Sequence, residues 1–198
     1  MAVLNRPAAS FHSRLNTFFH RWLVFCVLSC SGAQSLHAQA TALQENQVKA
    51  VFLFNFAQFV DWPPSAFPDP QSPLVIGILG NDPFDGYLDA TVKGEMVNGR
   101  PLIVQRYRRA EEIKGCQVLF ISGSEASRLP KILSVLAGRQ ILTVSDAEGF
   151  ATNGGMIRFV IVRNKVRFRV NLDAARAAGL KISSKLLRAA DVMKGGDD

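Results

Sequence analysis

Four short apolar runs recur along this chain, and stretches typical of helices or turns separate them. The runs are Leu74–Leu79, Leu102–Val104, Val118–Ile121 and Ile141–Val144. Strands that are apolar at nearly every position are typical of parallel sheets, because helices cover both faces of such a sheet. The chain is therefore predicted to fold as an α/β protein in which a mostly parallel sheet lies between two layers of helices.

The segment after Gly149 has a different pattern, which indicates a hairpin. Met156–Val162 and Val166–Val170 flank Asn164 and Lys165, a pair that suits a two-residue turn. Apolar residues alternate with arginines in the second arm, which predicts one buried and one solvent-exposed face. The complete prediction is a three-layer α/β sandwich with about six strands, mostly parallel, and a C-terminal antiparallel hairpin.

The first helix is predicted over Gln44–Val60. Val48, Val51 and Phe52 are among the apolar residues that recur there at steps of three and four. Because the segment is apolar nearly all round, we expect it to be well buried. Pro63 follows closely, and a proline ends a helix since it has no amide hydrogen.

Further helices are predicted after the third apolar run and at the C-terminus. They are Glu125–Ala137, Ala174–Ala178 and Lys185–Met193. Ser124 is the expected N-cap of the first of these, and Pro130 either kinks that helix or restarts it. Ser183 or Ser184 is the expected N-cap of the last one.

Residues 1–40 have the composition of a secretory signal peptide. They contain three arginines and no acidic residue, and they include the apolar run Trp22–Leu28. The segment ends in Ala38-x-Ala40, the small-residue pattern of a cleavage site. The apolar run is far shorter than the roughly 20 residues that span a bilayer. We therefore expect cleavage after Ala40 and export of the protein; a lipoprotein processed at Cys30 is the alternative.

The expected exported protein is a single domain, residues 41–198, without any histidine. Its 20 basic and 16 acidic residues give it a net charge of +4, and Cys116 is its only cysteine. Without histidine it cannot hold a Ser-His-Asp or Cys-His catalytic set, and it lacks the commonest ligand of zinc and copper. One cysteine cannot form a disulfide within the chain. We therefore expect no catalytic residue, no metal and no cofactor.

Basic and aromatic residues provide two candidate partner-binding surfaces. The arginines of the predicted hairpin could face an acidic partner, and the plainer interpretation is a solvated sheet face. These arginines are Arg158, Arg163, Arg167 and Arg169. Trp62 and Phe67 could form an exposed aromatic anchor, whereas half-buried aromatics at the end of the first helix are the alternative. No nucleic-acid-binding motif is present, so no nucleic-acid partner is expected.

The loop Gly80–Phe84 is the candidate small-ligand site. It follows the first predicted strand, at the edge where open α/β sheets commonly bind ligands. Its candidate residues are Gly80, Asn81, Asp82 and Phe84. The loop lacks the glycine pattern of a dinucleotide-binding turn. A structural turn is therefore the alternative interpretation.

Several segments, in order along the chain, resemble the YfiR family. They are Val48–Pro63, Ile78–Phe84, Gly99–Pro101, Cys116–Ile121, Leu142–Asp146, Gly154–Ile157 and Val166–Leu187. Each segment alone is weakly specific, but their ordered set is specific. The resemblance covers essentially all of residues 44–193.

The resemblance implies a three-layer α/β fold and a non-catalytic periplasmic repressor that often forms a homodimer. Members of the family bind the periplasmic sensor domain of an inner-membrane diguanylate cyclase and hold the cyclase inactive. An OmpA-like outer-membrane lipoprotein can sequester the repressor, which releases cyclic di-GMP synthesis and promotes biofilm. Some relatives pair the cysteine at the position of Cys116 with one in the first strand, where this chain has Gly77, so that bridge is absent here.

Two other functions stay open alongside the repressor. A periplasmic small-molecule-binding protein would use the edge of the open sheet. A regulator of a sensor histidine kinase would bind a different membrane partner through the same kind of surface. A hydrolase is disfavoured, because the exported domain has neither histidine nor a nucleophile motif. The residues alone leave the partner and the oligomeric state open.

Overall fold

An eight-stranded sheet runs through residues 41–193, the part of the chain that the computed structural model describes. Its strands, from one edge to the other, are β10 (Asp191–Met193), β8 (Lys165–Asn171), β7 (Ile157–Val162), β6 (Leu142–Ser145), β5 (Val118–Ile121), β2 (Leu74–Leu79), β4 (Arg100–Tyr107) and β3 (Met96–Val97). A separate two-stranded sheet pairs β1 (Val60–Asp61) with β9 (Lys181–Ile182). The predicted signal peptide lies outside the described residues, as does Cys30.

The sheet is mostly parallel, as predicted. Strands β2, β4, β5, β6 and β7 run in one direction, while β3, β8 and β10 run in the other. The antiparallel pair β7–β8 is the predicted C-terminal hairpin. The short edge strands β3 and β10 were not predicted, so the sheet has eight strands where about six were expected.

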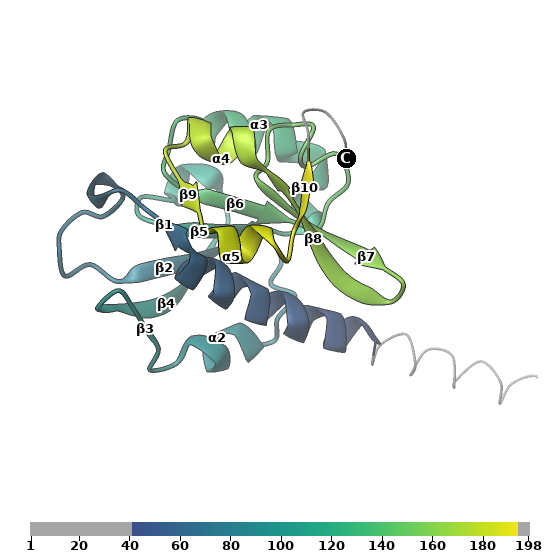
Figure 1. Cartoon of the computed structure of the whole chain (residues 1–198), viewed down its shortest axis with the longest axis horizontal. Helices are drawn as coiled ribbons and strands as arrows, with labels where there is room; N and C mark the ends of the chain where they lie inside the picture. The colour runs from purple at the N-terminus through teal and green to yellow at the C-terminus, as the bar shows by residue number, and fades with distance from the viewer. Residues whose placement is uncertain (1–40, 194–198) are drawn as a thin grey trace, which may run out of the picture. The chain divides into compact units, whose positions relative to one another are not determined.

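Helices cover both faces of the sheet (Figure 1). They are a helix over residues 41–59, η1 (Pro64–Ala66), α2 (Tyr87–Val92), η2 (Ala110–Glu112), η3 (Gly123–Arg128), α3 (Leu129–Leu136), α4 (Leu172–Ala177) and α5 (Ser184–Leu187). The helix over 41–59 packs on one face together with α2, α4 and α5, and α3 and η2 pack on the other. The three-layer α/β prediction is confirmed. None of the helices in residues 41–193 has the length and apolar character needed to cross a membrane.

Two apolar cores lie on the two faces of the sheet, because successive side chains of a strand point in opposite directions. The larger core contains a cluster of phenylalanine rings from the first helix and the hairpin. Phe56 and Phe168 lie 5.2 Å apart between ring centroids, and Phe56 and Phe159 lie 5.9 Å apart. Such spacing is favourable for aromatic pairs. The smaller core is mainly aliphatic, with Phe150 as its buried ring, and is built mainly from β2, β5 and α3.

The first helix is less buried than its apolar sequence predicts. Its buried face carries Leu53 and Phe56, whereas Val48 and Val51 are exposed. A segment that is apolar nearly all round gives no periodic signal for which side faces the core, so the prediction of a well-buried helix was wrong for Val48 and Val51. The helix ends at residue 59, and Val60 already belongs to β1.

The predicted helix Glu125–Ala137 is two elements, η3 and α3. Pro130 lies in the first turn of α3, where its missing amide hydrogen costs nothing, so the proline restarts the helix. The expected N-cap Ser124 was wrong by two residues. The Ser122 side chain is the cap, and it accepts a hydrogen bond from the Ser124 amide at 3.4 Å.

The last helix and the hairpin turn differ from their predicted bounds. The helix expected over Lys185–Met193 ends at Leu187, and the chain then forms edge strand β10. Ser183 is its N-cap, one of the two serines expected. The hairpin turn consists of Arg163 and Asn164, one residue earlier than predicted. Both have positive φ, 50° and 57°, which the twist of a two-residue hairpin requires.

Candidate functional site

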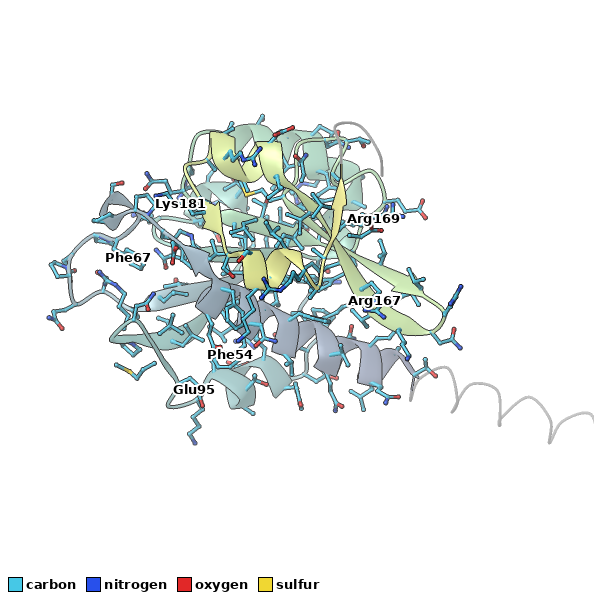
Figure 2. All side chains as sticks on the ribbon, in the orientation of Figure 1. Phe54, Phe67, Glu95, Arg167, Arg169 and Lys181 are labelled. Carbon is cyan, nitrogen blue, oxygen red and sulfur yellow. The ribbon has the colours of Figure 1, made fainter. Side chains whose placement is uncertain are left out.

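The β7–β8 hairpin gathers arginines on one face. Arg158 lies directly opposite Arg169, and Val160 lies opposite Arg167. Because side chains alternate along a strand, these arginines share the face opposite to the core phenylalanines. Arg163 lies at the turn, beyond the end of this face. Figure 2 shows Arg167 and Arg169 on the same hairpin.

Acidic groups neutralise only the base of this arginine face. Like charges directly opposite each other destabilise a strand pair, so Arg158 and Arg169 need counter-charges. Asp191 of β10 lies 3.8 Å from the Arg169 guanidinium. Within residues 41–193, Arg163 and Arg167 are exposed and form no ion pair. The outer end of the hairpin therefore keeps its positive charge free.

A cavity of about 440 Å³ lies at the base of the hairpin, next to the carboxyl end of β6. Lys49, Asp146, Glu148, Arg158 and Arg169 are its charged lining residues. The cavity combines three cationic and two anionic side chains. It can therefore complement a ligand or a side chain that carries charge of either sign.

An ion pair within this cavity joins the first helix to the sheet. Lys49 Nζ donates to Asp146 Oδ2 at 2.7 Å, and the two side chains are 8% and 30% exposed. Asp146 directly follows β6, and Lys49 lies on the buried face of the helix. Sequence reasoning missed this pair, although a lysine on the buried face of an apolar helix is a signal that a carboxylate partner is needed.

The aromatic candidates Trp62 and Phe67 are half-buried. The Arg100 guanidinium lies 3.8 Å from the centroid of the Phe67 ring, and it also donates to the Asp69 and Ser72 carbonyls. Trp62 packs against the larger core. Figure 2 shows Phe67 and Arg167 at opposite ends of the sheet, so the structure does not join the aromatic and arginine candidates into one surface.

Hydrogen bonds within the protein occupy the loop Gly80–Phe84. The Asp82 carboxylate accepts from the Phe84 amide at 2.8 Å and from Arg106 at 2.8 Å, and the Asn81 amide donates to Ser124 Oγ at 3.0 Å. Phe84 is buried and its ring lies 5.1 Å from that of Phe120. These contacts are those of a structural turn, and ligand binding at the loop stays a prediction.

Arg106 holds this loop against α2 and β4. Besides Asp82, it contacts both carboxylate oxygens of Asp89. The hydrogen bond from Arg106 lowers the pKa of Asp89, and the bond to Asp89 raises the pKa of Arg106. This three-residue network was also missed, because its members lie on three separate elements.

Cys116 is a free and fully buried cysteine. Burial raises the pKa of its thiol to about 12, so it is protonated and unreactive at neutral pH. Within residues 41–193, no cluster of three or more acidic, cysteine or histidine side chains is arranged to hold a metal ion.

The match to known families covers nearly all of the described fold. A sequence model of YfiR/HmsC-like proteins matches residues 46–191, from the first helix to the beginning of β10. The match includes the hairpin arginines, the cavity at their base and the Lys49–Asp146 ion pair. It confirms the resemblance that the ordered sequence segments indicate. The chain therefore belongs to the YfiR/HmsC-like family.

Proposed function

We propose that this protein is a non-catalytic periplasmic regulator that binds and represses the sensor domain of an inner-membrane diguanylate cyclase. Membership of the YfiR/HmsC-like family is the observation that carries the proposal, because it suggests a periplasmic regulator of cyclic di-GMP signalling. Export through a cleaved signal peptide, residues 1–40, belongs to the same proposal. An OmpA-like outer-membrane lipoprotein is the proposed second partner, which would remove the repressor from the cyclase.

The arginine face of the β7–β8 hairpin is the proposed contact with the cyclase. Arg163 and Arg167 form no ion pair within the described residues, so an acidic partner would not have to displace one. Exposed Ile161 and Val162 lie beside them. Interfaces commonly combine such apolar contacts with arginine, which supports a protein partner over a free counter-ion.

Repression requires that the protein bind the inactive sensor domain more tightly than the active one. A partner with equal affinity for both states would shift nothing. Moving a cyclase from 99% active to 99% inactive needs an affinity ratio of about ten thousand. The regulator therefore needs no chemistry of its own, which agrees with an exported domain that lacks histidine.

Charge reversal on the hairpin tests this proposal. Arg167→Glu should raise the dissociation constant for the cyclase at least tenfold and raise cyclic di-GMP in cells that carry only this variant. Lys131→Glu, an exposed residue of α3 with the same change in charge, is the matched control. Binding would be measured with the full-length cyclase in nanodiscs, and cyclic di-GMP in cell extracts.

The identity of the captured membrane protein decides between regulators. Recovery of a sensor histidine kinase in place of a cyclase would overturn the cyclase assignment and leave a regulator of that kinase. Failure of the folded wild-type protein to bind any inner-membrane sensor domain would overturn the whole proposal.

A small-molecule-binding role is the second candidate, and the charged cavity at the base of the hairpin favours it. Its volume of about 440 Å³ lies within the range of ligand sites. A ligand present at 100 times its Kd should stabilise the protein by about 2.7 kcal/mol in thermal unfolding. A metabolite panel that produces no such shift would remove this candidate.

A further inference from the structure

The outer end of the β7–β8 hairpin extends beyond the rest of the sheet (Figure 1). Strand β6 pairs only with the first two residues of β7, and β10 pairs only with the last three residues of β8. Within residues 41–193, the two strand pairs nearest the turn therefore have no further strand beside them. These pairs are Ile161 with Val166 and Val162 with Lys165. We call residues 161–166 the hairpin tip.

The hairpin tip combines exposed aliphatic side chains with basic ones. Ile161 and Val162 are each 47% exposed. Arg163 and Lys165, which follow them in the chain, are exposed as well. The whole hairpin, residues 157–171, contains five basic residues and no acidic one. The tip is therefore cationic, and it keeps apolar surface in contact with solvent.

The two exposed aliphatic side chains lie on opposite faces of the hairpin. Successive side chains of a strand alternate, so Val162 shares the face of Arg158 and Arg167, whereas Ile161 shares the face of Phe159. A partner that lies flat on one face leaves the other face in water. The interface of a bilayer surrounds an inserted tip and removes both side chains from water, which stabilises the bound state.

We propose that the hairpin tip binds the surface of a membrane that contains anionic lipid. Arg163 and Lys165 form no ion pair within the described residues, and lipid phosphates would supply the counter-charge. The aliphatic side chains enter the interface, while the longer basic side chains reach the headgroups. Each basic residue contributes about fivefold in affinity at such a surface, so a single tip binds reversibly.

The membrane contact rests on the proposed function, because a periplasmic repressor of a membrane-anchored cyclase works beside a bilayer. It also divides the proposed contact surface. Arg167 and Arg169, which lie closer to the sheet, face the cyclase, and the tip faces the bilayer. Membrane binding keeps the repressor near its target, which raises its effective concentration there.

Vesicle binding tests the contact. The exported protein, residues 41–198, keeps every described element and lacks the apolar run Trp22–Leu28, which would bind lipid by itself. It would be sedimented with vesicles of phosphatidylcholine alone and with vesicles that contain about one-third phosphatidylglycerol. The wild type should bind the anionic vesicles and not the neutral ones. High salt should release it, because salt screens exposed charges.

A double variant tests the charged part of the tip. Arg163→Gln/Lys165→Gln should weaken binding to anionic vesicles at least tenfold. Lys114→Gln/Lys131→Gln is the matched control, because it removes the same charge from exposed positions outside the hairpin. The control should bind nearly as the wild type does.

Two measurements test the aliphatic part of the tip. Ile161→Thr/Val162→Thr keeps the β-branched shape but lowers the apolar area, so binding should weaken at least threefold. A dye attached to Val162→Cys should shift its emission to shorter wavelength on anionic vesicles, because the dye leaves water. The same dye on Val135→Cys of α3, where the valine is 37% exposed, should show no shift. Buried Cys116 takes up no label in the folded protein.

Three results would overturn the proposal. One is a wild type that binds neither kind of vesicle; if that protein still binds the cyclase, the tip belongs to the protein contact. Another is binding that both double variants leave unchanged, because the contact would then lie elsewhere. The third is equal binding to neutral and anionic vesicles, which would mean that charge takes no part. Since the vesicles contain no protein, each of these results leaves the cyclase proposal to its own test.

Discussion

Gly77 leaves room for Cys116 in the smaller core. Any other residue type at position 77 would force its neighbours to move. A Cβ atom added at Gly77 would lie 2.7 Å from Cys116 Sγ, 2.8 Å from the Tyr107 ring and 2.9 Å from a Leu119 methyl group. Contacts this short are far below van der Waals separation. In a disulfide, however, the Cβ atom of one cysteine lies only about 3 Å from the sulfur of the other, so this close approach suits a cross-link to Cys116.

Gly77→Cys should therefore form a disulfide with Cys116. A bridge that closes a loop of about 40 residues contributes about 3–4 kcal/mol through the unfolded state, and crowding by Tyr107 offsets part of it. In the protein of residues 41–198, which lacks Cys26 and Cys30, thiol titration after denaturation should find no free thiol, and reduction should lower the free energy of unfolding. Gly77→Ser meets the same crowding without the bond and should be less stable than the wild type. Two free thiols in Gly77→Cys would contradict this.

At the scale of elements, Arg106 connects three parts of the fold near the carboxyl edge of the sheet. It belongs to β4, and it binds Asp82 in the loop after β2 and Asp89 in α2. The short helix α2 has six residues, too few to be stable alone. The ion pairs and the burial of Leu88 and Val92 together hold it in place.

Replacement of Arg106 should change how the free energy of unfolding depends on pH. The hydrogen bond from Arg106 lowers the pKa of Asp89 below 3.8, so the stabilisation is present above that pH and is lost as pH falls through the lower folded-state pKa. Arg106→Gln should cost about 0.5–1 kcal/mol at pH 7, since all three groups are partly exposed. The difference from the wild type should shrink below about pH 4 in urea unfolding.

Arg108→Gln is the matched control for this experiment, because Arg108 is exposed and its side chain forms no ion pair within residues 41–193. It should change stability little at any pH. A difference between Arg106→Gln and the wild type that is the same at pH 3 and pH 7 would show that the carboxylates contribute nothing through their charge.

At the scale of the whole molecule, the Lys49–Asp146 ion pair connects the first helix to the carboxyl end of β6. Removing one partner of a buried pair leaves the other charge without compensation, and the cost depends on which charge stays buried. Lys49 is nearly inaccessible, whereas Asp146 reaches solvent.

The two single variants should therefore differ. Asp146→Asn leaves a buried ammonium group and should cost about 2–3 kcal/mol. Lys49→Met leaves a carboxylate that water can reach and replaces the lysine stem by an apolar one, so it should cost under about 1 kcal/mol. Urea unfolding of both variants measures the difference. Equal losses would mean that the ammonium group is solvated in the folded protein.

The sequence predicts the parts of this fold that are determined locally. The four apolar runs become parallel strands of the sheet. Three of them, β2, β5 and β6, are buried at every position, which leaves a continuous apolar pattern, whereas β4 is buried only in part. Strands β3 and β10 have two and three residues and no such pattern, since a neighbouring strand rather than their own composition makes them extended.

The candidate site was predictable in part for the same reason. The alternation of the hairpin arginines is local, and it places three of them on one face as expected. Contacts between distant segments were not predictable. Lys49 and Asp146 are 97 residues apart, and nothing in the sequence near either one identifies the other.

The pairing of the first helix with the last strands determines when the chain can fold. Phe52 and Phe56 find their ring partners in Phe159 and Phe168, and β1 pairs with β9, so the larger core needs both ends of the domain. A segment that emerges first during synthesis or translocation therefore cannot complete its packing until nearly the whole chain is available. Such non-local closure slows folding. Slow folding suits the export that we propose, because the chain stays unfolded for longer. Truncation of the chain before β9 should expose the apolar side of the first helix and promote aggregation.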